Sequence, residues 1–420
     1  MTSKSTVKFH PIPKNGVSYL NKVVLAPMVR SGELPMRLLS LKHGADLVWG
    51  PETVDRAMIG TTRRINPRTS TVDFTRLPSN SHKKNLPPKE SLVYRLHPEL
   101  EKGKLIFQLG SAKPELAVQA AKLVAGDVAG IDLNAGCPKS FSTDGGMGAE
   151  LLKDPERLVS ILEALVREVG SPFEIGISVK IRILPSPEKT EELVKKLVKT
   201  GISGLTVHCR EPAMRKTERV KRDQVQMIVD ICHEAGIPCL LNGDITSMDQ
   251  GRALAAEYGT DGAMIALAAE SNPSCFRTAE QGGLLPWKEV VEEFLVTAMK
   301  VENKFGNTKH QLGLLMKGSD PSYRKMTQSR SYRAFCEALE LEKYMDMARE
   351  VDERSGILEM EQMEEKKKAE QEAARQQREK NKTNKQNARG NQNSQRGKRK
   401  REVKDDGVVR TPVPPSVTTV

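Results

Sequence analysis

Residues 130–148 read GIDLNAGCPKSFSTDGGMG and pass from a short apolar run into a glycine-rich turn. Pro138 ends the run, and a helical pattern, DPERLVSILEALVREVG, follows at 154–170. An apolar strand, a loop and an amphipathic helix in this order form one βα unit of a parallel sheet. Cys137 follows directly after the predicted strand of this unit, which places a thiol at the C-terminal end of the strand.

The same alternation of strand and helix recurs from residue 23 to residue 270. The segments that we predict to be strands are short apolar runs at 23–28, 46–50, 105–110, 130–135, 177–183, 204–210, 238–244 and 262–268. Several of the helical patterns between them end in glycine, as helices commonly do. Eight βα units in about 250 residues predict an α/β fold of the (β/α)8 TIM-barrel type. A doubly wound sheet is the alternative, but it normally carries Gly-x-Gly-x-x-Gly after its first strand, where this chain has APMVRSG.

The composition changes along the chain and divides it into four predicted parts. They are an N-terminal extension (1–20), the barrel (21–284), a small all-helical domain (285–352), and a charged helix with a disordered basic tail (353–420). The last 60 residues hold 16 Lys/Arg against 9 Asp/Glu and so supply +7 of the net charge of +12. KRKR at 398–401 has the composition of a nuclear-import patch, of a nucleic-acid contact, or of a solvated tail without a dedicated role.

The cysteines and the apolar runs restrict the class of protein. Six cysteines without a Cys-x-x-Cys pair predict neither a disulfide framework nor a metal site. The first residues, MTSKSTVKFHPIPKNG, lack the apolar stretch of a signal peptide, and no run approaches the ~18 apolar residues of a membrane span. We therefore expect a soluble protein of a reducing compartment, cytoplasmic or nuclear, with no membrane partner. The expected oligomeric state is a monomer, although no feature of the sequence fixes it.

Functional side chains of a (β/α)8 barrel lie where its strands end at the C-terminal face. The predicted strand ends place mostly polar residues on that one rim, namely Met28, Glu52, Gln108, Asn134 with Cys137, Lys180 with Arg182, His208 with Arg210, Asn242-Gly243-Asp244 and Ala266. Each residue alone also fits a structural role, such as hydrogen bonding to loop backbone. Their convergence on one rim predicts a shared polar site.

The residue types on this rim suit a flavin mononucleotide (FMN). Amides and small residues of the last two loops are expected to bind its phosphate. Lys180 would lie against the N1/O2 edge of the flavin ring, where reduction builds negative charge. No second nucleotide motif is present in the sequence, so a reduced nicotinamide such as NADPH would visit the same flavin face in turn with the substrate.

Cys137 then has a predicted role as a general acid. A double bond that accepts a hydride needs a proton at its other carbon, and a thiol with an ordinary pKa of about 8.5 is mostly protonated at neutral pH. The alternative is a small buried hydrophobic residue, and Pro138 with the flanking glycines argues against a simple core position.

Several motifs together resemble the tRNA-dihydrouridine synthase family. They are APMVRSGELPMR, FQLG, DLNAGCPK, GGMGAELL, VKIR, VHCR and NGD, spread over roughly residues 20–350, and the wording is most similar to the eukaryotic branch that acts on uridine 20 of the tRNA D-loop. The resemblance implies that tRNA is the partner and that Cys137 protonates C5 of an extruded uridine as hydride reaches C6. It implies FMN contacts from Pro27, Met28, Val29, Gln108, Lys180, His208, Asn242, Gly243, Asp244, Ala266 and Leu267. It implies substrate contacts from Asn134, Arg182 and Arg210.

This chain departs from the family pattern at three places. Ala266-Leu267 stands where members commonly have Gly-Arg or Ala-Arg, so a phosphate contact from that arginine is missing. Cys209 replaces a usual glycine and is expected to tighten the flavin pocket. Nothing after residue 350 has the length or apolar content of the double-stranded-RNA-binding domain that animal relatives carry.

The barrel rim, the tail and basic residues of the helical domain are therefore expected to bind tRNA. Those basic residues are Lys309, Lys317, Arg324, Lys325, Arg330 and Arg333. Two other functions remain open from the sequence. One is a flavin barrel of the dihydroorotate dehydrogenase type that acts on a small molecule. The other is a non-catalytic RNA-binding barrel.

Overall fold

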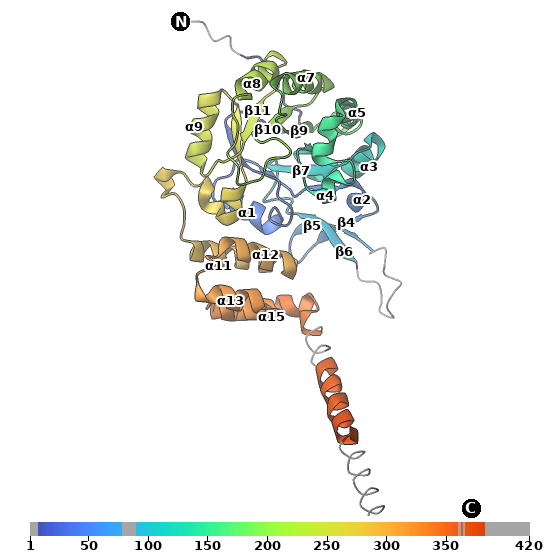
Figure 1. Ribbon diagram of the computed structural model, residues 1–420, viewed down its shortest axis with the longest axis vertical. Helices are drawn as coiled ribbons and strands as arrows, with labels where there is room; N and C mark the ends of the chain where they lie inside the picture. The colour runs from blue at the N-terminus through green and yellow to red at the C-terminus, as the bar shows by residue number, and fades with distance from the viewer. Residues whose placement is uncertain (1–6, 78–89, 360–362, 364–365, 383–420) are drawn as a thin grey trace, which may run out of the picture. The chain divides into compact units, whose positions relative to one another are not determined.

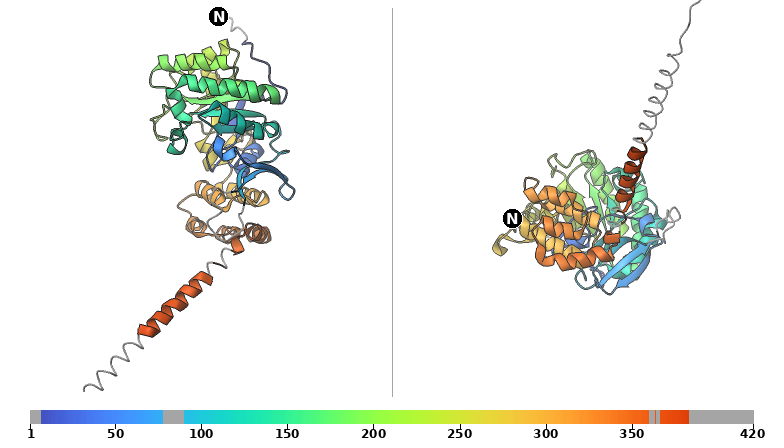
Figure 2. Two further views of the ribbon diagram at one scale, coloured as in Figure 1. Left: turned by 90° about the vertical axis from the view of Figure 1, so that its right-hand side faces the viewer. Right: turned by 90° about the horizontal axis from the view of Figure 1, so that it is seen from below.

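The computed structural model describes residues 7–77, 90–359, 363 and 366–382. Residues 1–351 form one compact unit and residues 352–420 a second one. The first unit contains the barrel, an antiparallel sheet and most of the helices (Figures 1 and 2).

Eight parallel strands form a closed barrel in the first unit. They follow one another around the barrel as β2 (Val48–Trp49), β1 (Lys22–Leu25), β12 (Gly262–Ile265), β11 (Cys239–Asn242), β10 (Gly204–His208), β9 (Gly176–Arg182), β8 (Gly130–Ala135) and β7 (Leu105–Gly110). A parallel pairing of β2 with β7 completes the ring. All eight predicted strands are present, and the closure excludes a doubly wound open sheet.

Helices surround the strands, and the longer ones bury apolar faces against them. The helices of this layer are α1 (Leu34–Lys42), α2 (Asp55–Met58), α3 (Pro114–Val124), α4 (Ser140–Thr143), α5 (Pro155–Leu165), α6 (Ser171–Phe173), α7 (Pro187–Leu197), α8 (Val225–Glu234), α9 (Met248–Tyr258) and α10 (Leu267–Ser271). The side chains of Asp154, Ser186 and Ser247 cap α5, α7 and α9. Such a cap stabilises a helix by about 1 kcal/mol.

Short helical turns extend helices of the chain or lie between them. They are η2 (Ala125–Asp127), η3 (Gly148–Lys153), η4 (Val166–Gly170), η5 (Val198–Thr200), η6 (Pro273–Phe276), η7 (Ala279–Gln281) and η8 (Glu342–Tyr344).

A polar contact inside the barrel joins three neighbouring strands. Gln108 of β7, Asp132 of β8 and Ser178 of β9 are paired in register and buried. Asp132 accepts hydrogen bonds from Gln108 Nε2 and Ser178 Oγ, each at 2.8 Å. Burial raises the pKa of Asp132 to about 6. The contact fixes the Gln108 side chain below the C-terminal rim.

An antiparallel sheet between β2 and β7 was not predicted from the sequence. Its strands are β4 (Thr62–Asn66), β5 (Thr71–Arg76) and β6 (Ser91–Leu96), in the order β4-β5-β6. Before it lies β3 (Thr53–Val54), which pairs with β7 beyond the position where β2 leaves it. The chain therefore bulges at residues 50–52, between two short strands on the same neighbour.

A helical region follows the barrel, as predicted. It contains α11 (Trp287–Lys300), α12 (Phe305–Leu315), α13 (Pro321–Gln328), α14 (Tyr332–Ala338) and α15 (Met345–Arg354). Figure 1 shows α11 and α12 next to α1 and the antiparallel sheet, with α13 in a further layer beyond them. Gln311 Nε2 of α12 donates a hydrogen bond to the carbonyl of Glu270 in α10 at 2.7 Å, so the helical region contacts the C-terminal side of the barrel.

In the second unit, residues 366–382 are helical and exposed, within the segment where the sequence predicts a charged helix. KRKR at 398–401 and the rest of the tail lie outside the described residues. Within the described parts of the chain, no helix is both long enough and apolar enough to cross a membrane.

Candidate active site

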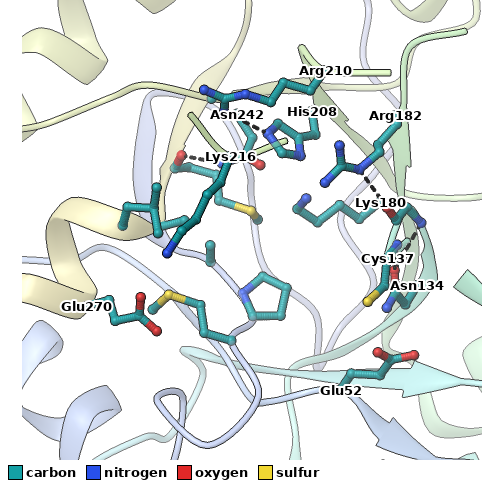
Figure 3. Close-up of a pocket in the computed structure, with 18 of the residues that line it drawn as sticks. Glu52, Asn134, Cys137, Lys180, Arg182, His208, Arg210, Lys216, Asn242 and Glu270 are labelled. Atoms are coloured by element: carbon teal, nitrogen blue, oxygen red, sulfur yellow. Dashed lines mark hydrogen bonds between the residues drawn. The ribbon is translucent and has the colours of Figure 1, made fainter. Parts of the chain in front are cut away.

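A cavity of about 690 Å³ opens at the C-terminal ends of the barrel strands. All fifteen residues predicted to form the site line it, namely Pro27, Met28, Val29, Gln108, Asn134, Cys137, Lys180, Arg182, His208, Arg210, Asn242, Gly243, Asp244, Ala266 and Leu267. The structure thus brings the predicted set together around one space (Figure 3). Their individual assignments to cofactor or substrate remain predictions.

Hydrogen bonds to its backbone amide and carbonyl hold Cys137 at the end of β8. The side-chain oxygen of Asn134 accepts hydrogen bonds from the amides of Gly136 at 3.0 Å and Cys137 at 3.1 Å. On the other side, the carbonyl of Cys137 accepts from the amide of Ala149 at 2.8 Å. Gly148 has φ +58°, and a Cβ there would collide with that carbonyl. The glycine-rich turn therefore packs directly behind the cysteine.

Cys137 is half-buried, whereas Cys209, Cys232, Cys239, Cys275 and Cys336 are buried. Burial raises the pKa of the Cys137 thiol, the amide of Lys139 opposes this effect, and the charge of Glu52 adds to it. The thiol is consequently protonated at neutral pH and open to the cavity, which are the two properties that a general acid needs.

The strand after Cys137 supplies two cations to the cavity. Burial, reinforced by the charge of Arg182, lowers the pKa of Lys180 to about 8. Arg182 donates hydrogen bonds to the carbonyls of Gly136 at 2.7 Å and Glu211 at 3.0 Å, so it joins the loops after β8 and β10. Burial and the nearby Lys180 lower the pKa of His208, which keeps its imidazole neutral. The histidine is thus a neutral polar group beside two cations.

The loops after β10 and β11 are tied together at the cavity wall. Asn242 Nδ2 donates to the carbonyl of Met264 at 2.8 Å, which orients its amide. Arg210 donates to Asp244 Oδ1 at 2.5 Å and to the carbonyl of Glu218 at 2.8 Å. The guanidinium of Arg210 is therefore engaged with the protein itself, and a contact between Arg210 and substrate remains a prediction.

Two departures from the family pattern have different structural outcomes. Cys209 is fully buried in the hydrophobic core and burial raises its pKa to about 12. It does not line the cavity itself, so an effect of Cys209 on the flavin pocket stays a prediction. Leu267 lines the cavity and is 45% exposed.

Other lining residues were not assigned to the site from the sequence. They are Glu52, Lys139, Lys216, Thr246 and Glu270 among the polar ones. The sequence places Glu52 at a polar strand end but assigns it no role. Lys216 lies in the loop after β10, and no sequence pattern marks it as a site residue. In Figure 3 the side chain of Lys216 extends across the cavity on the side of Asn242 and Glu270. Its amine donates no hydrogen bond to any of the described residues.

Fold and cavity define a (β/α)8-barrel protein with a polar, cationic site and one accessible thiol at the C-terminal face. No cluster of potential metal ligands occurs in the described ranges. Residues 24–378 match the dihydrouridine synthase (Dus) family, and the chain belongs to that family.

Three curated relatives show how similar the chain is to members with different names. The tRNA-dihydrouridine(20) synthase (NAD(P)+) of Schizosaccharomyces pombe is 51% identical over 331 residues, which are 78% of this chain and 66% of the relative. This share is just under two thirds of the relative's length. The protein of the same name from Saccharomyces cerevisiae is 44% identical over 75% of this chain and 82% of the relative. The tRNA-dihydrouridine(20a/20b) synthase (NAD(P)+) of S. pombe is 29% identical over 72% of this chain and 82% of the relative.

Proposed function

We propose that this protein reduces the C5=C6 bond of a tRNA uridine, at position 20 of the D-loop, with NADPH as the reductant. The observation that carries the proposal is the protonated, accessible thiol of Cys137 in one cavity with Lys180 and Arg182, in a chain of the Dus family. Position 20 is supported by the greater identity to the two relatives named for that position than to the relative named for 20a/20b.

The residues of the cavity fit FMN. The cavity volume of about 690 Å³ lies within the range of about 300–1,000 Å³ that small-molecule sites occupy. The Lys180 amine donates no hydrogen bond within the described part of the chain, so its charge is available to an anionic ligand atom. Gln108, Asn242 and His208 add oriented polar groups. When bound, FMN supplies the hydride that reaches C6 of the uracil.

Lys216 brings a positive charge to the cavity, whereas Leu267 brings none. Both residues line the same cavity, and Lys216 belongs to the loop after β10. A cofactor phosphate needs positive charge or amide donors, because its own charge must be compensated on leaving water. We assign Lys216 to this phosphate.

Cys137 acts as the acid that completes the reduction. Its S–H bond breaks, its proton joins C5 of the uracil, and the electron pair of the S–H bond stays on sulfur as a thiolate. A positioned acid contributes about 10²–10⁴-fold to such a step. Asn134 and Arg182 lie on either side of the thiol in the cavity wall, where they can bind the polar edge of the base (Figure 3).

The tRNA would be held by the rim and the helical region. Lys317, Arg324, Lys325 and Arg330 are exposed there, whereas Lys309 is half-buried and donates to the carbonyl of Ser329 at 2.8 Å. We propose that the protein acts on tRNA as a monomer. Six cysteines without a disulfide support a reducing setting, cytoplasmic or nuclear.

An absorbance spectrum of the purified protein tests this proposal. We expect a flavin band that NADPH bleaches without oxygen and that tRNA lacking dihydrouridine restores. Recovery with a small pyrimidine but not with tRNA would favour a small-molecule flavin barrel. A protein that takes up no flavin on reconstitution would favour a non-catalytic RNA-binding barrel.

A further inference from the structure

The side chain of Glu52 lies next to Cys137 and has no role in the reaction as proposed above. It lies in the bulge between β2 and β3, and both strands pair with β7. One carboxylate oxygen, Oε1, accepts a hydrogen bond from Ser142 Oγ at 2.8 Å. The other oxygen, Oε2, is buried and has no hydrogen-bond partner in the structure. A buried carboxylate oxygen without a partner costs free energy, so its retention calls for a chemical reason.

The surroundings of Glu52 leave space for its carboxyl group. A Cβ on Gly110 would lie 2.6 Å from Oε1 of Glu52. A Cβ on Gly148 would lie 2.5 Å from Oγ of Ser142, the hydroxyl that holds the carboxyl group. Two glycines thus make room for the carboxyl group and its hydroxyl partner. Only one of the carboxylate oxygens is used by that partner.

Figure 3 shows the thiol of Cys137 and the side chain of Asn134 pointing toward the carboxyl group of Glu52. Burial raises the pKa of Glu52, and the contacts with Ser142, Asn134 and Cys137 oppose that effect. The pKa of Cys137 is also raised above that of an ordinary thiol. A carboxylic acid is ordinarily a stronger acid than a thiol, so a protonated Glu52 can give its proton to a thiolate at Cys137.

We propose that Glu52 returns a proton to Cys137 after each turnover. The inference rests on the proposed function, in which Cys137 loses a proton to the substrate. The O–H bond of the Glu52 carboxylic acid breaks, an S–H bond forms at Cys137, and the electron pair of the O–H bond stays on the carboxylate. A proton from solvent, delivered through the open cavity, then converts the Glu52 carboxylate back to the carboxylic acid.

Burst kinetics separate this role from a structural one. In Glu52→Gln the thiol still starts protonated, so the first equivalent of dihydrouridine should form within about threefold of the wild-type rate. Later turnovers should slow by about tenfold or more, because a positioned proton donor has been removed. Equal losses in the first and later turnovers, or no loss in either, would overturn the proposal.

Ser142→Ala is a milder second variant, which keeps the carboxyl group but removes the hydroxyl that orients it. It should show the same burst with a smaller loss in later turnovers. Glu270→Gln is the matched control, because Glu270 lines the same cavity but accepts from Ser31 Oγ at 2.6 Å and lies across the cavity from Cys137 (Figure 3). It should give no burst. A burst in Glu270→Gln would remove the assignment to Glu52.

Alkylation of Cys137 by iodoacetamide, followed from pH 6 to pH 10, tests the contact without tRNA and without flavin. The other five cysteines are buried, so Cys137 should react first. In Glu52→Gln the reaction should begin at lower pH, because the negative charge that raises the pKa of the thiol is gone. An unshifted profile would contradict the contact. Failure of wild-type protein to reduce tRNA would instead contradict the proposed function.

Discussion

The two ends of the barrel carry different electrostatics on the same scaffold. At the C-terminal end, five cationic side chains line a cavity of about 690 Å³, namely Lys139, Lys180, Arg182, Arg210 and Lys216. At the N-terminal end, a hollow of about 300 Å³ next to the beginnings of β9 and β10 contains the charged residues Lys14 and Glu174. These two lie 3.7 Å apart, with side-chain exposures of 77% and 51%.

The difference shows which charges can act on a ligand. An exposed pair such as Lys14 and Glu174 contributes about 0–1 kcal/mol and cancels its own field. Lys180 is half-buried in the cavity wall, and its loss of solvation together with the charge of Arg182 outweighs the charge of Asp132 in shifting its pKa. Polar convergence at one end of a (β/α)8 barrel therefore marks a site, whereas charges at the other end stabilise the protein.

Among substitutions at the two ends of the barrel, Cys137→Ala at the C-terminal end should have the largest effect on activity. We expect dihydrouridine formation to fall by about 10²–10⁴-fold while flavin stays bound, because only the acid is removed. Flavin absorbance and nucleoside analysis of the tRNA measure the two properties separately. A fully active variant would contradict the role of the thiol.

The charge of Lys180 should give the reaction a pH dependence. Its pKa is lowered to about 8, so the ammonium is present below that pH and is lost as the pH rises through it. We expect the rate of flavin reoxidation by tRNA to fall above about pH 8, and Lys180→Arg to move this limb upward because arginine stays charged. Lys180→Met should lower the rate by about 10²-fold at pH 7. A flat profile from pH 7 to pH 9.5 would exclude the charge of Lys180 from the chemistry.

Lys216→Ala should weaken flavin binding by about three- to tenfold, since one charge-assisted contact is lost from a partly open cavity. Dialysis followed by measurement of retained flavin gives the affinity. Lys14→Ala, at the opposite end of the barrel, is the matched control and should retain as much flavin as wild type. Equal retention in both variants would remove Lys216 from the phosphate site.

The smallest expected effect concerns the helical region. Arg324 and Lys325 are exposed on α13, and replacing both with alanine should weaken tRNA binding several-fold and reduce the salt dependence by about two phosphate contacts. Lys195 and Lys196 of α7 are a control pair, since they bond to Glu191 and Glu156. A larger loss in the control would place the tRNA surface elsewhere.

The barrel strands could be predicted because each is a short apolar run that is buried by its neighbours, as Leu105–Gly110 and Gly130–Ala135 illustrate. The antiparallel sheet could not, because Thr62–Asn66 is mostly exposed and polar and is held as a strand by pairing with β5. The rim residues followed from the strand ends. The role of Glu52 did not, because its partner Ser142 is 90 residues away in the chain.

Arg95 connects the antiparallel sheet to the helical region. It is 9% exposed, pairs with Asp73, and donates to the carbonyls of Val301 and Glu302. A protein ending at residue 284 would expose this guanidinium and remove its carbonyl partners. The barrel therefore cannot be separated from the helical region near residue 285, although the composition changes there. The barrel and these helices are expected to unfold in a single thermal transition.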